Sequence, residues 1–279
     1  MPVARLKRVL LLFLALLLGN ADAHEFWLEP QQFIYSRGDV IRIRFRVGEQ
    51  FTGENWKGNR DRVQQLQLHY ADLTDDLSPL LSYRGGDSLQ FTVFEEGTLL
   101  VTFQSTNSFL ELEASAFEAY LQEDGLEDIL HFRREHGETD SAGREFYQRS
   151  VKTLLQVGAV KTHTYKKKTT LPLDIIALDP PYGLQREDTL RFQVLFRNKV
   201  LPGVKMRFWH RLAGSVTDTS LRTDDNGLVA FPIQPTGEWM LSCVHMIRLE
   251  DDPKAQWQSF WGSLTWGYTG KNLPSETSR

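Results

Sequence analysis

Alternating apolar and polar residues recur along most of this chain, and this pattern limits its fold more than any other feature. In residues 41–47, Ile41, Ile43 and Phe45 are separated by arginines. Runs typical of strands also occupy residues 65–70, 99–103, 190–194, 204–210 and 239–247. Short runs with a period of two, separated by turn residues, are typical of half-buried strands in β-sandwiches. The sequence therefore predicts a mainly β protein with two β-sandwich-like modules.

Helical spacing is confined to the middle of the chain. Apolar residues recur three or four apart in residues 117–121 and again in residues 126–130, with Gly125 between the two pieces. A third helix is predicted from Arg144 to Gln156, ending near Gly158. We therefore expect a helical segment that joins the two β modules.

Charged residues recur along one side of the predicted third helix and form a charged row. Glu145 and Arg149 are four residues apart, and Lys152 lies about one turn further on. This spacing indicates an exposed helix face. Together with Arg144 and Tyr147, the row is a candidate partner surface, and a packing role is the alternative.

The first residues have the pattern of a secretory signal peptide. A basic stretch precedes an apolar run over residues 9–18, and residues 21–23 form the small-x-small pattern that signal peptidase cleaves. The apolar run is about half of the ~20 residues that span a bilayer, so a retained anchor is the less favoured alternative. We expect cleavage after Ala23 and a mature protein with no membrane span.

Five segments follow from these patterns. They are a signal peptide (1–23), an N-terminal β module (24–107), a helical connector or insertion (108–165), a C-terminal β-sandwich (166–270) and a flexible tail (271–279).

Composition and charge limit the cellular compartment and the classes of partner that the sequence predicts. The formal net charge is −4, and Lys166–Lys168 is the only basic cluster, so nucleic-acid binding is not expected. Cys243 is the single cysteine, whereas secreted eukaryotic domains often carry several. Together with the signal peptide, this favours a bacterial periplasmic protein.

Cleavage after Ala23 would place His24 at the amino terminus. The free α-amine and the Nδ1 atom of the same residue can chelate one metal ion, and a second imidazole would complete a histidine brace. Such an all-nitrogen site suits Cu(II) and Ni(II). The strand-like residues 25–28 follow at once and would hold the terminus in place.

His245 is the predicted second ligand, because it lies in a strong strand pattern. His210 and the acidic residues 250–252 are further candidates, although a core histidine and a solvated turn are the favoured interpretations of them. His69 alternates with glutamines and is expected to be exposed. Cys243 is expected to be buried.

Several motifs resemble a known family. These are HEFWLEP at residues 24–30, the central stretch over residues 118–158, TDDNGLVAF at 223–231, GEWMLSCVHM at 237–246 and WQSFWGSLTW at 257–266. In this order they are similar to NikM-like periplasmic proteins, a family associated with nickel and cobalt uptake and long catalogued as a domain of unknown function.

The resemblance implies a periplasmic metal-handling protein. It also implies a C-terminal sandwich (166–270) like transthyretin and carboxypeptidase-regulatory domains, and it points to His24 and His245 as the metal-binding histidines. Integral nickel transporters of this kind carry a histidine at the second position and membrane spans. This chain has neither, so the resemblance implies at most an accessory component.

The sequence thus favours a non-enzymatic protein that binds Ni, Co or Cu through His24 and His245 and passes the ion to a membrane metal transporter or stores it. One alternative is a metal-free structural or interaction module. Another is a histidine-brace copper mono-oxygenase acting on a polysaccharide.

Overall fold

A computed structural model describes residues 25–83 and 85–269, so the predicted signal peptide, His24 and the predicted tail lie outside the described residues. The strands of the N-terminal half are β1 (Glu25–Pro30), β2 (Ile34–Tyr35), β3 (Val40–Glu49), β4 (Thr52–Asn55), β5 (Val63–Tyr70), β6 (Leu73–Asp76), β7 (Ser88–Thr92), β8 (Gly97–Ser105), β9 (Ser108–Leu112) and β10 (Gly143–Val157). Those that follow are β11 (Leu173–Ala177), β12 (Thr189–Phe196), β13 (Lys199–Val200), β14 (Lys205–Leu212), β15 (Ser215–Arg222), β16 (Leu228–Pro232), β17 (Glu238–Arg248) and β18 (Trp257–Gly267).

The described helices are α1 (Ala114–Glu123), α2 (Glu127–Glu135) and three short 3-10 turns, η1 (Arg60–Arg62), η2 (Ser78–Leu80) and η3 (His163–Lys166). The prediction of a mainly β fold is confirmed. No helix in residues 25–83 or 85–269 is long and apolar enough to cross a membrane.

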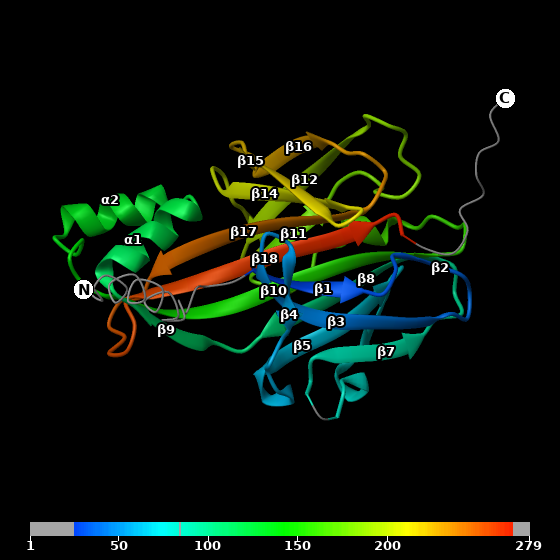
Figure 1. Cartoon of the computed structure of the whole chain (residues 1–279), viewed down its shortest axis with the longest axis horizontal. Coiled ribbons are helices and arrows are strands. Elements are labelled where there is room, and N and C mark those ends of the chain that lie inside the picture. Colours follow the sequence, from blue (N-terminus) through cyan, green and yellow to red (C-terminus); the bar gives the residue numbers. More distant parts are fainter. Residues whose placement is uncertain (1–24, 84, 270–279) are drawn as a thin grey trace, which may run out of the picture.

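One large sheet runs through the molecule. Its strands follow the order β15-β14-β17-β18-β10-β8-β5-β6, and β2 and β9 also pair with β10. Strand β10 is parallel to β18 and antiparallel to β8, so it joins strands from the two ends of the chain (Figure 1). The two predicted β modules and the segment between them therefore contribute to a single central sheet.

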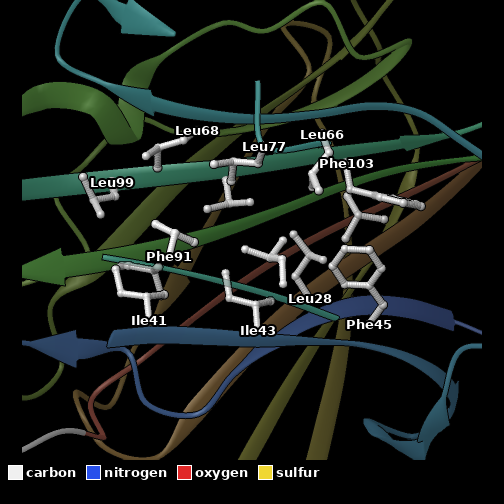
Figure 2. Packing of buried hydrophobic residues seen from close by; sticks show 14 of the residues in the cluster. Leu28, Ile41, Ile43, Phe45, Leu66, Leu68, Leu77, Phe91, Leu99 and Phe103 are labelled. Atoms are coloured by element: carbon white, nitrogen blue, oxygen red, sulfur yellow. The ribbon is translucent and has the colours of Figure 1, made fainter. Parts of the chain in front are cut away.

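A small sheet of β1, β3, β4 and β7 covers one face of the central sheet. Apolar side chains from both layers fill the space between them. Figure 2 shows Ile41, Ile43 and Phe45 of β3 lying opposite Leu66 of β5 and Phe103 of β8. The arginines that alternate with these β3 residues lie on the other side of the strand, as the period of two predicts.

A second small sheet, formed by β11, β12, β13 and β16, packs on β14, β17 and β18. The residues that face this sheet include Phe208, Trp239 and Leu241. On β17, the alternate residues Ser242 and Val244 point to the other face of the central sheet. Helices α1 and α2 pack on that other face, against Val244 and Trp261. Both faces of the central sheet are therefore covered.

The predicted third helix is wrong, because residues 143–157 form β10, a fifteen-residue strand at the centre of the large sheet. Residues four apart share a side in a strand as well as in a helix. The spacing of Glu145 and Arg149 could therefore not separate the two structures. Residues 149–157 are buried without interruption, as expected of a strand covered on both faces.

The charged row of β10 is not an exposed surface. Glu145, Arg149 and Lys152 are 0%, 6% and 1% exposed. The Nζ atom of Lys152 donates to Asp174 of β11 at 2.6 Å, which links the central sheet to the second small sheet. Since most of the row is inside the protein, the packing interpretation replaces the partner-surface interpretation.

Candidate functional site

The chain that follows the predicted cleavage point is firmly fixed. Strand β1 pairs with β3 along its whole length, from Glu25 opposite Gly48 to Pro30 opposite Ile43. Two hydroxyl groups of β18 also hold its backbone. Ser263 donates to the carbonyl of Phe26 at 2.6 Å, and Thr265 donates to that of Leu28 at 2.9 Å. The first described residue thus begins an anchored strand.

The carboxyl group of Glu25 is buried at the start of this strand. Its Oε1 atom accepts a hydrogen bond of 2.6 Å from the Ser242 hydroxyl. Its Oε2 atom is the one fully buried carboxylate oxygen of the described residues with no hydrogen-bond partner. Burial raises the pKa of Glu25 to about 7, although the Ser242 hydrogen bond and the charge of Arg207 oppose this shift.

Asp124 lies close to Glu25, at the end of α1. Its Oδ1 atom is 3.5 Å from the Arg207 guanidinium, which is a loose ion pair. Burial raises the pKa of Asp124 to about 7, and Arg207 acts in the opposite direction. Glu25 and Asp124 are therefore two neighbouring carboxyl groups with raised pKa values, and the charge of Arg207 acts on both.

Glu25 and Asp124 line a small cavity of about 20 Å³, together with Lys205, Arg207 and Ser242. This space is sufficient for about one water-sized occupant. Glu25 and Asp124 also line a larger open cleft of about 730 Å³ beside α1, β14 and β15. The small cavity is thus next to a route from solvent.

The cationic side chains near Glu25 and Asp124 bind the C-terminal end of α1. Lys205 and Arg207 both donate to the carbonyl oxygen of Glu123, at 2.7 Å and 2.6 Å. Carbonyl groups at a helix C-terminus carry partial negative charge and favour such contacts. Neither cation makes a short ion pair with Glu25 or Asp124, whereas Lys152 does so with Asp174.

Glu145 is a further carboxyl group, fully buried under α1, and both of its oxygen atoms accept hydrogen bonds. It accepts hydrogen bonds from Tyr120 at 3.3 Å and from Ser259 at 3.1 Å, and Trp261 donates to the Ser259 hydroxyl. Burial raises the pKa of Glu145 to about 8. This arrangement is structural packing beneath the helix.

His245 lies on the opposite face of the central sheet. It shares the face of Cys243 and Leu241, and its ring is 4.4 Å from that of Phe196 in β12. Glu25 lies on the Ser242 face of the same strand. Burial lowers the pKa of His245 to about 4, so the imidazole is neutral at pH 7. Because residue 24 lies outside the described residues, its pairing with His245 stays a prediction.

The other candidate ligands are separate from this place. His210 is held by the Thr236 carbonyl at 2.9 Å and stacks on Trp239. Residues 250–252 are an exposed turn. His69 is 4% exposed, so its predicted exposure is wrong, because Thr74 and Thr102 bind both ring nitrogens inside the protein. Cys243 is buried as expected.

Among the described residues, no three histidine, cysteine or acidic side chains are grouped as a metal site. Asp124 was not predicted as a site residue, because it is 99 positions from Glu25 in the chain and lies near it only through the packing of α1.

Comparison with known proteins places this mainly β chain in a family. Residues 21–247 match the family described as a domain of unknown function, DUF4198, and the chain belongs to that family. No curated protein gives a significant match.

Among solved structures, a DUF4785 family protein from Legionella pneumophila subsp. pneumophila str. Philadelphia 1 is 11% identical with a TM-score of 0.25. The match covers 77% of this chain and 50% of that chain, so it spans half the length of the solved protein. A likeness at this level carries no argument about function.

Proposed function

We propose that this protein is an exported protein that binds Ni(II), Co(II) or Cu(II) through the α-amine and the Nδ1 atom of His24. One observation carries the proposal. Glu25 is 8% exposed, bonded to Ser242 and paired in a strand. A terminus created by cleavage after Ala23 would begin one residue before this anchored strand.

Anchoring matters because chelation by a free chain end has an entropic cost. A residue bonded to a fixed strand has fewer conformations to lose when both of its nitrogens bind one ion. The α-amine has an ordinary pKa of about 7.7–8.0, so protons compete only modestly with a metal at neutral pH. In an uncleaved chain the same nitrogen is an amide and does not act as a ligand.

The expected role is capture of the ion in the periplasm, followed by delivery to a membrane metal transporter or by storage. The resemblance of several motifs to NikM-like proteins supports this role, because that family is associated with nickel and cobalt uptake. The same resemblance supports His245 as a second ligand, although its position on the opposite face of β17 argues against it. We therefore treat His245 as a ligand to be tested.

The proposal is tested on protein recovered from the periplasm of an expressing bacterium. Its intact mass should correspond to a chain that starts at His24. In calorimetric titrations with Cu(II), Ni(II), Co(II) and Zn(II), we expect one tight site that His24→Ala removes. The matched control is His131→Ala, because His131 is an exposed histidine on α2 that pairs only with Glu135.

The metal-free alternative predicts a different result. If His24→Ala and His131→Ala bind these metals as the unsubstituted protein does, the amino-terminal site is wrong. If the unsubstituted protein also shows no tight metal site, the protein would be a structural or interaction module.

A further inference from the structure

We propose that Arg149 of β10 and Arg62 of η1 form a binding site for a tetrahedral oxyanion such as phosphate or sulfate. The inference goes beyond the proposed metal binding, because none of the residues that form the site is a candidate metal ligand. Arg149 belongs to the charged row of β10, and the proposed metal site gives that row no role.

The first argument is the burial of Arg149 without an acidic partner. Three cationic side chains of the described residues are buried, and two of them have a carboxylate partner. Arg133 pairs with Glu118 at 2.8 Å, and Lys152 pairs with Asp174 at 2.6 Å. Arg149 is 6% exposed and has no such pair within residues 25–83 and 85–269. A buried charge without a counter-charge costs free energy, and a bound anion would supply that charge.

The groups around Arg149 attract its charge without neutralising it. Its Cζ atom is 5.0 Å from the ring centroid of Phe26 and 5.0 Å from that of Tyr147, so both rings make cation–π contacts. Burial lowers the pKa of Arg149, Tyr147 opposes this shift, and the charge of Arg62 adds to it. The second cation therefore makes the environment of Arg149 more positive.

The second argument is that Arg62 brings another guanidinium group to Tyr147. Its Cζ atom is 5.7 Å from the Trp56 ring centroid, and its Nη2 atom donates to the Ser108 hydroxyl. Ser108 is paired with Tyr147 where β9 meets β10. Burial would raise the pKa of Tyr147, but the charges of Arg149 and Arg62 and its hydrogen bonds lower it. Two guanidinium groups and two hydroxyl groups therefore converge here.

The donor set indicates the class of anion. A guanidinium group presents its N–H donors as a planar fork that matches phosphate and carboxylate oxygens. Phosphate and sulfate offer more acceptor oxygens than a carboxylate, which suits donors that come from four side chains. Arg62, Ser108 and Tyr147 are half-buried, so an ion can reach them from solvent, whereas Arg149 lies deeper. The site therefore favours a tetrahedral oxyanion.

The test uses the mature protein without added metal, with inorganic phosphate and inorganic sulfate as probes. Sodium chloride and sodium acetate at equal ionic strength are the reference salts. We expect phosphate or sulfate to raise Tm above its value in either reference salt, and calorimetric titration to show one site.

Two variants and one control locate that site. We expect Arg149→Gln and Arg62→Gln each to weaken the binding by about tenfold or more, because each removes charged hydrogen-bond donors. Arg134→Gln should bind as the unsubstituted protein does, since Arg134 is exposed on α2. Arg62 is half-buried, so Arg62→Gln tests the site even if Arg149→Gln does not fold.

Three outcomes would contradict the inference, and none of them affects the proposed metal binding. If Tm in phosphate and sulfate equals Tm in chloride, no anion binds. If phosphate and sulfate stabilise all three arginine variants as they do the unsubstituted protein, the effect is general exclusion of these salts from the protein surface. If near-ultraviolet absorbance at neutral pH shows a tyrosinate that Tyr147→Phe removes, and phosphate does not bind, Tyr147 itself is the counter-charge.

Discussion

Three carboxyl groups lie near α1, and they differ in what surrounds them: Glu25 and Glu145 are buried, whereas Asp124, at the end of the helix, is half-buried. Glu145 has hydroxyl donors on both oxygens, whereas Glu25 has one donor and Asp124 has a loose ion pair. Burial raises the pKa of all three. The three groups differ in their partners, since both oxygen atoms of Glu145 accept hydrogen bonds from hydroxyl groups.

Glu145 gives a prediction about pH. Its pKa is about 8 in the folded chain against an ordinary value of 4.5, so the folded state binds more protons between these values. The stability contributed by this group is complete below pH 4.5 and is lost as pH rises to 8, an effect of up to a few kcal/mol. Glu145→Gln removes this titration, because the amide stays neutral.

We therefore expect Glu145→Gln to be more stable than the unsubstituted protein above about pH 8, and the advantage to vanish near about pH 5. Urea unfolding at both values measures it. Glu111→Gln, on the exposed side of β9, is the control and should show no such change. Equal stabilities of Glu145→Gln and the unsubstituted protein at high pH would show that Glu145 is ionised without cost.

At the residue scale the sequence predicted some environments and missed others. Burial of Cys243 followed from its strand neighbours. His69 was expected to be exposed because it alternates with glutamines, but residues near β11 cover that face of β5, as the hydrogen bond between Gln65 and Thr170 shows. Whether a face is covered depends on distant segments, so a local period of two cannot reveal it.

At the scale of elements, β10 connects the parts of the molecule. It pairs with β18 on one side and with β8 and β9 on the other. The two α-helices were predictable, because Gly125 separates two runs with helical spacing. Strand β10 was not, because the four-residue spacing of Glu145 and Arg149 fits a helix and a strand equally. Its pairing with β18 joins residues more than a hundred positions apart, and local patterns do not encode such a contact.

The buried ion pair between β10 and β11 gives a second prediction. Lys152 and Asp174 are 1% and 2% exposed. Lys152→Met leaves the Asp174 charge buried with the Thr169 amide as its remaining hydrogen-bond donor, and we expect a loss of about 3–5 kcal/mol in unfolding free energy. Adding Asp174→Asn should recover part of this loss, because the second change removes the uncompensated charge.

Urea denaturation of the single and double variants measures these changes. Lys57→Met is the control, since the pair between Lys57 and Glu54 is exposed and should contribute less than about 1 kcal/mol. A double variant less stable than Lys152→Met would contradict the account of the buried pair.

At the scale of the whole molecule, the N-terminal and C-terminal β regions share one central sheet. A mainly β fold with sandwich-like packing was predictable from the periods of two and the turn residues. The continuity of the sheet was not, since it depends on which strands pair. A chain that ends near residue 165 would lack β18, the strand that pairs with nine consecutive residues of β10.

The shared sheet predicts one cooperative unfolding transition. Loss of either region would expose the edge of β10 and its buried polar side chains, so neither half should persist alone. Urea transitions followed by tryptophan fluorescence and by far-ultraviolet circular dichroism should coincide. Two separated transitions would show that the regions fold independently.

The central claim is that export creates the metal site by freeing the α-amine of His24. The most direct test compares Cu(II) titrations of the protein that starts at His24 with those of a protein carrying one additional alanine before it. The extra residue turns the ligand nitrogen into an amide and leaves every described side chain unchanged. We predict tight one-to-one binding that the extra residue abolishes. Equal binding by the two proteins would contradict the account.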